Sequence, residues 1–165
     1  MLHEVTIAGM TMDPTSNTPI IILKSVKSDQ AIPIWIGLLE ATSIASALRN
    51  IKFDRPMTHD LFKNLIENMK LDVSKIEVCD LKNNTFYAKI YFTSEERNFH
   101  MDARPSDAIA IAIRFSAPIY VDEKIIEQSQ TFDTDYEMID ETEEGKKWAE
   151  YLGKLTPDDF GKYKI

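Results

Sequence analysis

Cysteine is nearly absent from this sequence of 165 residues, because Cys79 is the only one. A single cysteine cannot form a disulfide within the chain, and it excludes a zinc site built from several cysteines. No stretch approaches the roughly 18 consecutive apolar residues that a membrane-spanning helix needs. The N-terminus lacks the basic flank of a signal peptide. We therefore expect a cytoplasmic protein that does not enter a membrane.

Positive charge is also in short supply, since 19 lysines and arginines face 27 aspartates and glutamates, for a formal net charge of −8. The acidic residues concentrate late in the chain. Residues 132–151 hold eight acids and two lysines, whereas residues 1–131 hold 17 acids and 14 bases. Nucleic-acid-binding proteins usually carry a basic surface, because phosphate contacts supply much of their affinity. Any contact with nucleic acid would therefore need a local basic patch.

The sequence lacks the glycine-rich loops that bind nucleotide phosphates and the Gly-x-Ser-x-Gly turn of many serine hydrolases. It contains five glycines in all. These absences exclude the most recognisable nucleotide-binding and serine-hydrolase motifs. What is present is an ordinary globular composition, with 44% hydrophobic and 28% charged residues, in a length that suits one domain.

Runs of β-branched residues alternate irregularly with segments whose apolar residues recur at helical spacing. The pattern predicts an α+β fold: a single domain of mixed β-sheet with packed helices over residues 1–131, and an acidic helical appendage over residues 132–165. The pair Asn83-Asn84 suits a tight turn with positive φ. We expect strands at 3–12, 19–24, 31–36, 73–80, 85–93, 97–102 and 118–121, and helices at 39–51, 58–70, 105–115, 122–129 and 139–152.

The helix expected over residues 58–70 has a clear start and a clear apolar face. Thr58 is a natural N-cap, and an acid in the first turn favours the positive end of the helix dipole. The residues expected to form its buried stripe are Leu61, Leu65, Ile66 and Met69.

Two segments repeat the pairing of arginine with proline where a loop enters a helix. Residues 55–60 read Arg-Pro-Met-Thr-His-Asp, and residues 102–107 read Asp-Ala-Arg-Pro-Ser-Asp. A helix start presents free backbone N–H groups and a partial positive charge, which favour a bound phosphate. Arginine adds a planar fork that matches phosphate oxygens. If the two helix starts converge in space, they form one polar cleft.

Phosphodiester hydrolysis needs charge neutralisation, an activated water molecule and a protonated leaving group. Histidine is the side chain that ordinarily changes charge near neutral pH, so His59 suits a general base or acid. Carboxylates suit a hard divalent cation. The remaining candidates are Asp60, Asp102 and Asp107 as catalytic carboxylates, Arg55, Arg104, Thr58 and Ser106 as substrate-binding residues, and Asp102, Asp107 and Glu40 as ligands for a divalent metal, Mg²⁺ or Mn²⁺.

Structural roles account for the same residue types, because helix caps and local ion pairs use them too. The spacing alone does not decide between the two interpretations. The structural alternatives are caps or first-turn acids for Thr58, Ser106, Asp60, Asp107 and Glu40, local ion pairs for Arg55 and Arg104, a packed or surface position for His59, and a helix cap or a partner contact for Arg114.

Three motifs occur in the order seen in the bifunctional nuclease (DNase/RNase) domain family. They are Ile34-Trp35-Ile36-Gly37 with Glu40-Ala41, then residues 55–61, then residues 102–110. The chain therefore resembles this family over about residues 1–130, and its ending, residues 155–163, resembles the tails of bacterial members. The resemblance implies a mixed α/β domain with nuclease activity on both DNA and RNA. Its polar motif positions are Glu40, Arg55, Thr58, His59, Asp60, Asp102, Arg104, Ser106 and Asp107.

The leading hypothesis is a nuclease that hydrolyses phosphodiester bonds in DNA and RNA, with a divalent metal as a candidate cofactor. Two alternatives stay open. One is a non-catalytic module that binds a small anionic ligand or a protein partner. The other is a structural homo-oligomer, in which exposed apolar strands such as residues 20–23 would pair between subunits.

Overall fold

The structure is a computed structural model that describes residues 1–129. The acidic helix expected at residues 139–152 and the rest of the appendage lie outside this range. No helix within it is both long and apolar enough to cross a membrane. The elements are β1 (Leu2–Asp13), β2 (Thr18–Ser25), β3 (Ala31–Trp35), α1 (Leu38–Leu48), α2 (Thr58–Asn68), β4 (Asp72–Lys82), β5 (Thr85–Thr93), β6 (Asn98–Ala103), α3 (Pro105–Phe115), β7 (Ile119–Asp122) and α4 (Glu123–Ser129).

The strands form one mixed sheet of seven strands in the order β3-β2-β1-β7-β4-β5-β6. Neighbours pair antiparallel, except for β4 and β7, which pair parallel. The chain reaches β7 through α3, as a parallel neighbour requires a crossover. Strand β7 therefore joins two halves of the sheet, β1–β3 and β4–β6. The expected α+β domain with a mixed sheet is confirmed.

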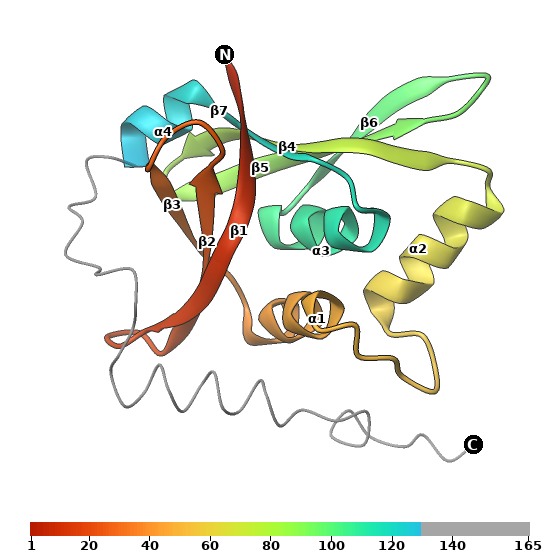
Figure 1. The fold of residues 1–165 in the computed structure, drawn as a ribbon, viewed down its shortest axis with the longest axis horizontal. Helices are drawn as coiled ribbons and strands as arrows, with labels where there is room; N and C mark the ends of the chain where they lie inside the picture. The colour runs from red at the N-terminus through yellow and green to blue at the C-terminus, as the bar shows by residue number, and fades with distance from the viewer. Residues whose placement is uncertain (130–165) are drawn as a thin grey trace.

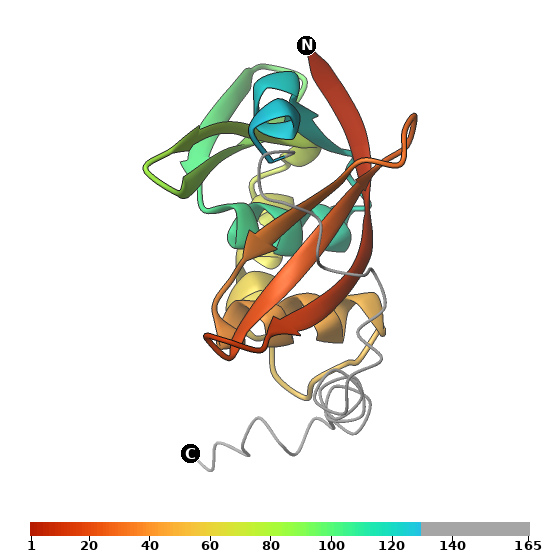
Figure 2. The same ribbon diagram turned by 90° about the vertical axis from the view of Figure 1, so that its left-hand side faces the viewer.

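The two halves of the sheet run at a steep angle to each other, and α1, α2 and α3 lie within that angle (Figure 1). In the view turned by 90°, α3 again lies between α1 and strands β4 and β5 (Figure 2). Helix α4 packs instead against β3, β4 and β7. The angle between the sheet halves thus determines where the starts of α1 and α3 meet.

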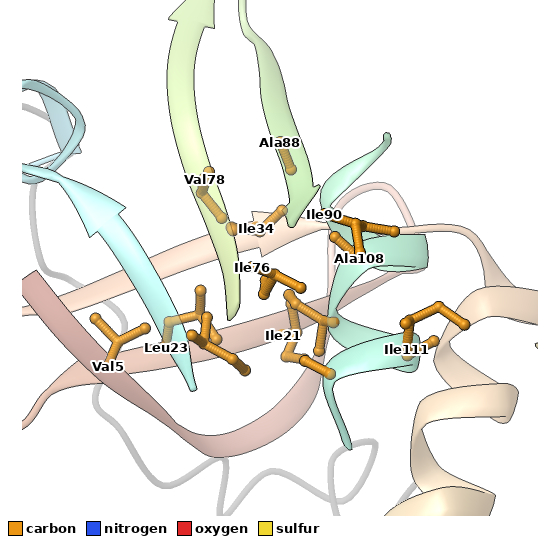
Figure 3. Close-up of a cluster of buried hydrophobic side chains, with 14 of the residues drawn as sticks. Val5, Ile21, Leu23, Ile34, Ile76, Val78, Ala88, Ile90, Ala108 and Ile111 are labelled. Atoms are coloured by element: carbon orange, nitrogen blue, oxygen red, sulfur yellow. The ribbon is translucent and has the colours of Figure 1, made fainter. Parts of the chain in front are cut away.

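One apolar core fills the space between the sheet halves and α3. Full burial of a large aliphatic side chain contributes about 1.5–3 kcal/mol relative to exposure, so the shared core holds both halves and α3 in fixed positions. The side chains labelled in Figure 3 are Val5, Ile21, Leu23 and Ile34 from β1–β3, Ile76, Val78, Ala88 and Ile90 from β4 and β5, and Ala108 and Ile111 from α3.

Helix α3 is buried around most of its circumference, including all of residues 108–112. A helix that is apolar on all sides belongs in the interior of a domain. Its charged side chains lie at its two ends, Asp107 in the first turn and Arg114 in the last. Because a buried charge is costly unless it is paired, the neighbouring helices must supply partners at both ends.

The buried face of α2 differs from the expected one. Leu61, Leu65 and Met69 are exposed, and only Ile66 of the predicted stripe is buried. Phe62 packs against the core as well, with its ring edge-on to Phe92. Among the described helices α2 packs mainly on α3, and it stands at the end of the helical layer (Figure 1). A single neighbour cannot cover a wide apolar stripe.

Three smaller expectations have mixed outcomes. Asn83 and Asn84 have φ of 49° and 57°, which confirms the tight turn between β4 and β5. Thr58 is not the N-cap of α2, because Met57 occupies that position and its backbone N–H donates to Asp60 at 3.1 Å. The idea that residues 20–23 form an exposed strand is wrong, since β2 lies between β1 and β3 and its side chains there are largely buried.

Candidate active site

Polar side chains from α1, α2 and α3 meet in one connected network. Each helix contributes a pair, and the residue before α3 adds a second arginine. On α3, Asp107 and Arg114 are seven residues apart, so they lie on the same face of the helix, about 10 Å apart along its axis. The network consists of Glu40 and Ser43 on α1, His59 and Asp60 in the first turn of α2, and Arg104, Asp107 and Arg114 before and on α3.

At the centre of this network, Ser43, His59 and Asp107 form a hydrogen-bonded chain. Ser43 Oγ lies 2.8 Å from His59 Nδ1, and His59 Nε2 lies 3.0 Å from Asp107 Oδ1. Asp107 and His59 are 48 residues apart in sequence. The structure therefore brings the starts of α2 and α3 together, which is the convergence that a shared polar site requires.

When the His59 ring is neutral, its partners determine which of its nitrogens carries the proton. An ionised carboxylate can only accept hydrogen bonds, so His59 Nε2–H donates to Asp107. The lone pair of Nδ1 then accepts the hydroxyl hydrogen of Ser43. Arg114 Nη2 donates to the same Ser43 oxygen at 3.1 Å. In this arrangement a neutral His59 can take a proton from the Ser43 hydroxyl while Asp107 stabilises the resulting imidazolium.

Arg104 lies at the exposed end of the network. Its Nε and Nη2 donate to the two oxygens of Asp107 at 2.7 and 3.1 Å, and Nη2 also lies 2.8 Å from Glu40 Oε1. Its side chain is nevertheless 66% exposed. A ligand can therefore reach the guanidinium without displacing the core of the network.

Arg114 lies at the buried end, with a side chain that is 7% exposed. Its Nε donates to Asp60 Oδ1 at 2.7 Å, and its Nη1 donates to the carbonyl of Ala110 at 2.9 Å. Together with its bond to Ser43, these contacts tie α3 to both α1 and α2. Arg114 thus holds the three helices together rather than facing a ligand.

The two groups nearest the exposed end have shifted pKa values. Burial acts to raise the pKa of Asp107, but the hydrogen bonds from Arg104 and His59 outweigh it, so the pKa of this carboxyl is lowered from 3.8. The hydrogen bonds to Asp107 raise the pKa of Arg104 above its ordinary value. Asp107 is therefore an anion at neutral pH, as an orienting partner of His59 must be.

The lowered pKa of Asp107 makes the stability of the domain sensitive to acid. Stabilisation from a depressed carboxyl pKa is complete above the unfolded value and is lost as the pH falls through the folded value. We expect the melting-temperature advantage of the wild type over Asp107→Asn to be full above about pH 4 and to shrink below it. Thermal melts across this range measure it, and a constant difference between the two proteins would contradict the assignment.

A cleft of about 410 Å³ opens beside Arg104. It lies where the start of β2, the end of β3 and the β4–β5 turn approach the starts of α1 and α3. Its lining combines aromatic rings, hydroxyl groups and one guanidinium. The lining residues are Thr18, Ile34, Trp35, Ile36, Gly37, Asn84, Thr85, Phe86, Arg104, Pro105 and Ser106.

Several candidates from the sequence lie outside the network. Arg55 and Thr58 are exposed, in the loop before α2 and at its first residue. Asp102 is exposed on β6, and it alternates with Phe99 and Ala103, which pack against the core. Asp102 therefore faces away from the helices. Ser106 is buried and lines the cleft.

Only two of the three expected metal ligands, Glu40 and Asp107, lie close together. Glu40 and Asp107 converge on the guanidinium of Arg104, which supplies the positive charge between them. Asp102 lies on the other side of the sheet. Within residues 1–129 no three His, Cys, Asp or Glu side chains are placed to hold an ion together. The donor set therefore does not fit a divalent cation in this arrangement.

Ser43 is the network residue that the sequence motifs did not indicate. It lies outside both Arg-Pro segments, among small residues that are typical of any packed helix. The one signal was its position three residues after Glu40, which places both polar side chains on one face of α1. Arg114 was expected to cap α3 or to reach a partner, and it does both: it donates to the Ala110 carbonyl on α3, and also to Asp60 on α2 and Ser43 on α1.

The family model for the bifunctional nuclease domain matches residues 21–134, more than half of the chain. The chain belongs to the bifunctional nuclease domain family. All the network residues fall within the matched range.

Relatives differ in how much of their length this chain covers. An uncharacterized protein of Mycobacterium tuberculosis is 36% identical over 164 residues, which covers 96% of this chain and 98% of that protein. Bifunctional nuclease 1 of Oryza sativa subsp. japonica is 29% identical over 116 residues, 68% of this chain and 35% of that protein. Bifunctional nuclease 2 of Arabidopsis thaliana is 27% identical over 93 residues, which covers 54% of this chain and 28% of that protein. The chain thus spans about a third of the plant proteins.

Proposed function

We propose that this protein hydrolyses phosphodiester bonds of nucleic acid, DNA and RNA, at the junction of α1, α2 and α3. The observation that carries the proposal is the Ser43–His59–Asp107 chain, whose Asp107 end lies beside the exposed guanidinium of Arg104. The chain supplies proton transfer, and the guanidinium supplies charge for a phosphate. Family membership supports the same substrate, because the plant relatives carry the name bifunctional nuclease.

The proton chemistry follows from the assigned tautomer. A water molecule attacks phosphorus and passes a proton to Ser43 Oγ, as Oγ passes its own proton to His59 Nδ1. The bond from water oxygen to phosphorus forms, and the bond from phosphorus to the leaving oxygen breaks. The leaving oxygen takes a proton from bulk water, and His59 later returns its proton to solvent. Asp107 stabilises the transient imidazolium.

Arg104 is the phosphate-binding residue in this proposal. A planar guanidinium matches two phosphate oxygens and stabilises the charge that develops during transfer. A divalent metal, Mg²⁺ or Mn²⁺, is not needed for any of these steps. Whether cleavage nevertheless depends on one is decided by running each assay with a chelator and with added metal.

The two Arg-Pro segments offer a matched pair of variants. We expect Arg104→Gln to lower kcat/KM by about 10- to 100-fold, as expected for losing a charged hydrogen bond, whereas Arg55→Gln stays near wild type. The measurement is initial cleavage of single- and double-stranded DNA and RNA by each purified variant. Equal activity of Arg104→Gln and wild type would rule out this site. Cleavage that survives in every variant would indicate a contaminating nuclease.

A second candidate is a module that binds an anionic ligand or a protein without cleaving it. Charge balance favours a protein or a ligand of low charge over a polyanionic strand, because three carboxylates in the network face two guanidinium groups. The network is therefore not a strong attractor for polyanions. Binding of nucleotide by the clean protein, with no cleavage of any substrate, would support this function over hydrolysis.

A further inference from the structure

We propose that the cleft beside Arg104 holds one unpaired nucleotide of a nucleic-acid strand, with the base against Trp35 and the phosphate at Arg104 in place of the Glu40 carboxylate. This rests on the proposed function for the identity of the substrate. It adds a binding subsite, a preference for single strands and a role for Glu40 that catalysis alone does not require.

The cleft has the size and lining that a nucleotide needs. Its volume of about 410 Å³ falls within the range of roughly 300–1,000 Å³ typical of small-ligand sites. Trp35 and Phe86 supply aromatic surface, and Arg104 supplies the charge. Hydroxyl and amide groups of the lining can bond the sugar or the base edge. An apolar lining with few polar groups is the usual form of such a site.

Trp35 is held in place while its ring remains accessible. Its indole Nε1–H donates to Asp13 Oδ2 at 2.9 Å, and Asp13 itself is buried. Trp35 is 38% exposed, although it ends an otherwise apolar strand. A fixed, partly exposed indole is a suitable platform for a base, because stacking on an aromatic ring tolerates any base.

The Glu40 carboxylate occupies the position at Arg104 that a phosphate would take. Its Oε1 lies 2.8 Å from Arg104 Nη2, and this is a single contact. Asp107 instead binds Arg104 through both oxygens and also accepts from His59. Glu40 is therefore the more weakly held of the two carboxylates. A phosphate that arrives at Arg104 displaces Glu40 and leaves the catalytic chain intact.

Gly37 makes room for the Glu40 carboxylate. Its φ of −72° and ψ of 157° are open to any residue, so conformation does not require glycine here. A Cβ at this position would overlap Glu40 Oε2, the far end of a flexible side chain. Alanine at position 37 would therefore push the carboxylate away from Arg104 at little structural cost. Glycine at position 37 therefore lets the Glu40 carboxylate stay beside Arg104.

An aromatic platform in a cleft selects unpaired bases. In a duplex the faces of each base are stacked on its neighbours and its edge is paired, so the base must leave the helix to reach Trp35. A base in a single strand has no such barrier. The cleft therefore predicts tighter binding of single strands than of duplexes of the same length.

The test measures binding in the His59→Ala background, so that cleavage does not interfere. Fluorescence anisotropy of a labelled oligothymidylate, and of a duplex of equal length, gives the dissociation constants. We expect Glu40→Gln and Gly37→Ala each to tighten single-strand binding by about 3- to 10-fold, because each frees a charge at Arg104. Glu67→Gln is the matched control, since it removes the same charge beside Lys63 alone and should change binding less than about twofold.

Trp35 is tested with two variants. Trp35→Ala should weaken single-strand binding by about 5- to 50-fold through loss of stacking. Trp35→Phe keeps a ring and is expected to fold and bind, but the oligonucleotide should no longer quench tryptophan fluorescence as it does in the parent protein. Unchanged quenching in Trp35→Phe would overturn the assignment of the cleft, whether or not Trp35→Ala folds.

The outcomes separate this inference from the proposed function. Equal effects of Glu40→Gln, Gly37→Ala and Glu67→Gln, or equal affinity for single strands and duplexes, would overturn the cleft proposal even if the wild type cleaves nucleic acid. The expected binding pattern without cleavage by the wild type would overturn the nuclease proposal and keep the cleft. Loss of cleavage in Glu40→Gln with no gain in binding would overturn the role given to Glu40 here.

Discussion

Replacement of His59 by alanine is expected to lower kcat/KM for cleavage of nucleic acid by about 100- to 10,000-fold, the usual contribution of a positioned proton-transfer group. His59 is the one imidazole in the network, and both of its ring nitrogens have partners. Without it, Ser43 has no group to which it can pass a proton. Initial cleavage rates at several substrate concentrations measure the effect.

His100 provides the control for this variant. It is an exposed histidine on β6 whose ring lies against Tyr91, so His100→Ala changes the same residue type outside the network. Asp107→Asn should reduce activity in the same direction as His59→Ala, because a neutral amide does not stabilise an imidazolium. Full activity of His59→Ala in a preparation free of other nucleases would remove this site from consideration.

Replacement of Arg114 by methionine is expected to reduce the free energy of unfolding by about 2–4 kcal/mol. The side chain is 7% exposed, and its loss leaves Asp60, Ser43 and the carbonyl of Ala110 without their donor. The main cause of this loss of stability is the Asp60 carboxylate, which no longer has a guanidinium partner between the helices. Urea denaturation, followed by circular dichroism, gives the free energy directly.

Arg104→Met is the comparison that makes the Arg114 result interpretable. Arg104 is 66% exposed, and exposed ion pairs contribute about 1 kcal/mol or less. The two variants should therefore differ in effect: Arg104→Met should lower activity, and Arg114→Met should lower the free energy of unfolding. Similar small losses of stability in both variants would show that Arg114 does not hold the helices together.

The sequence predicted the elements well because hydrophobic periodicity and turn chemistry act locally. The strand runs, the Asn83-Asn84 turn and the helix after Pro105 each depend on residues close in sequence. The buried stripe of α2 was predicted wrongly, because burial depends on how many neighbours a helix has. Leu61, Leu65 and Met69 repeat at helical spacing, yet nothing among the described elements covers them.

The site could be predicted only in part, for the same physical reason. Local sequence placed His59 and Asp107 at helix starts, and the fold brings them within 3.0 Å. It could not distinguish Asp107 from Asp102, because the side of β6 on which Asp102 lies depends on the register of the sheet. Ser43 reaches His59 only because α1 packs beside α2 and α3. No pattern within α1 contains that information.

The position of β7 has a consequence for how the molecule assembles. The last strand of the described chain is inserted between β1 and β4, the first strands of the two halves of the sheet, β1–β3 and β4–β6. A nascent chain that ends before residue 119 contains every side chain of the polar network. It lacks β7, the strand that joins the two halves of the sheet. Contacts this distant in sequence form slowly. The catalytic constellation should therefore mature only after nearly all of the domain has left the ribosome.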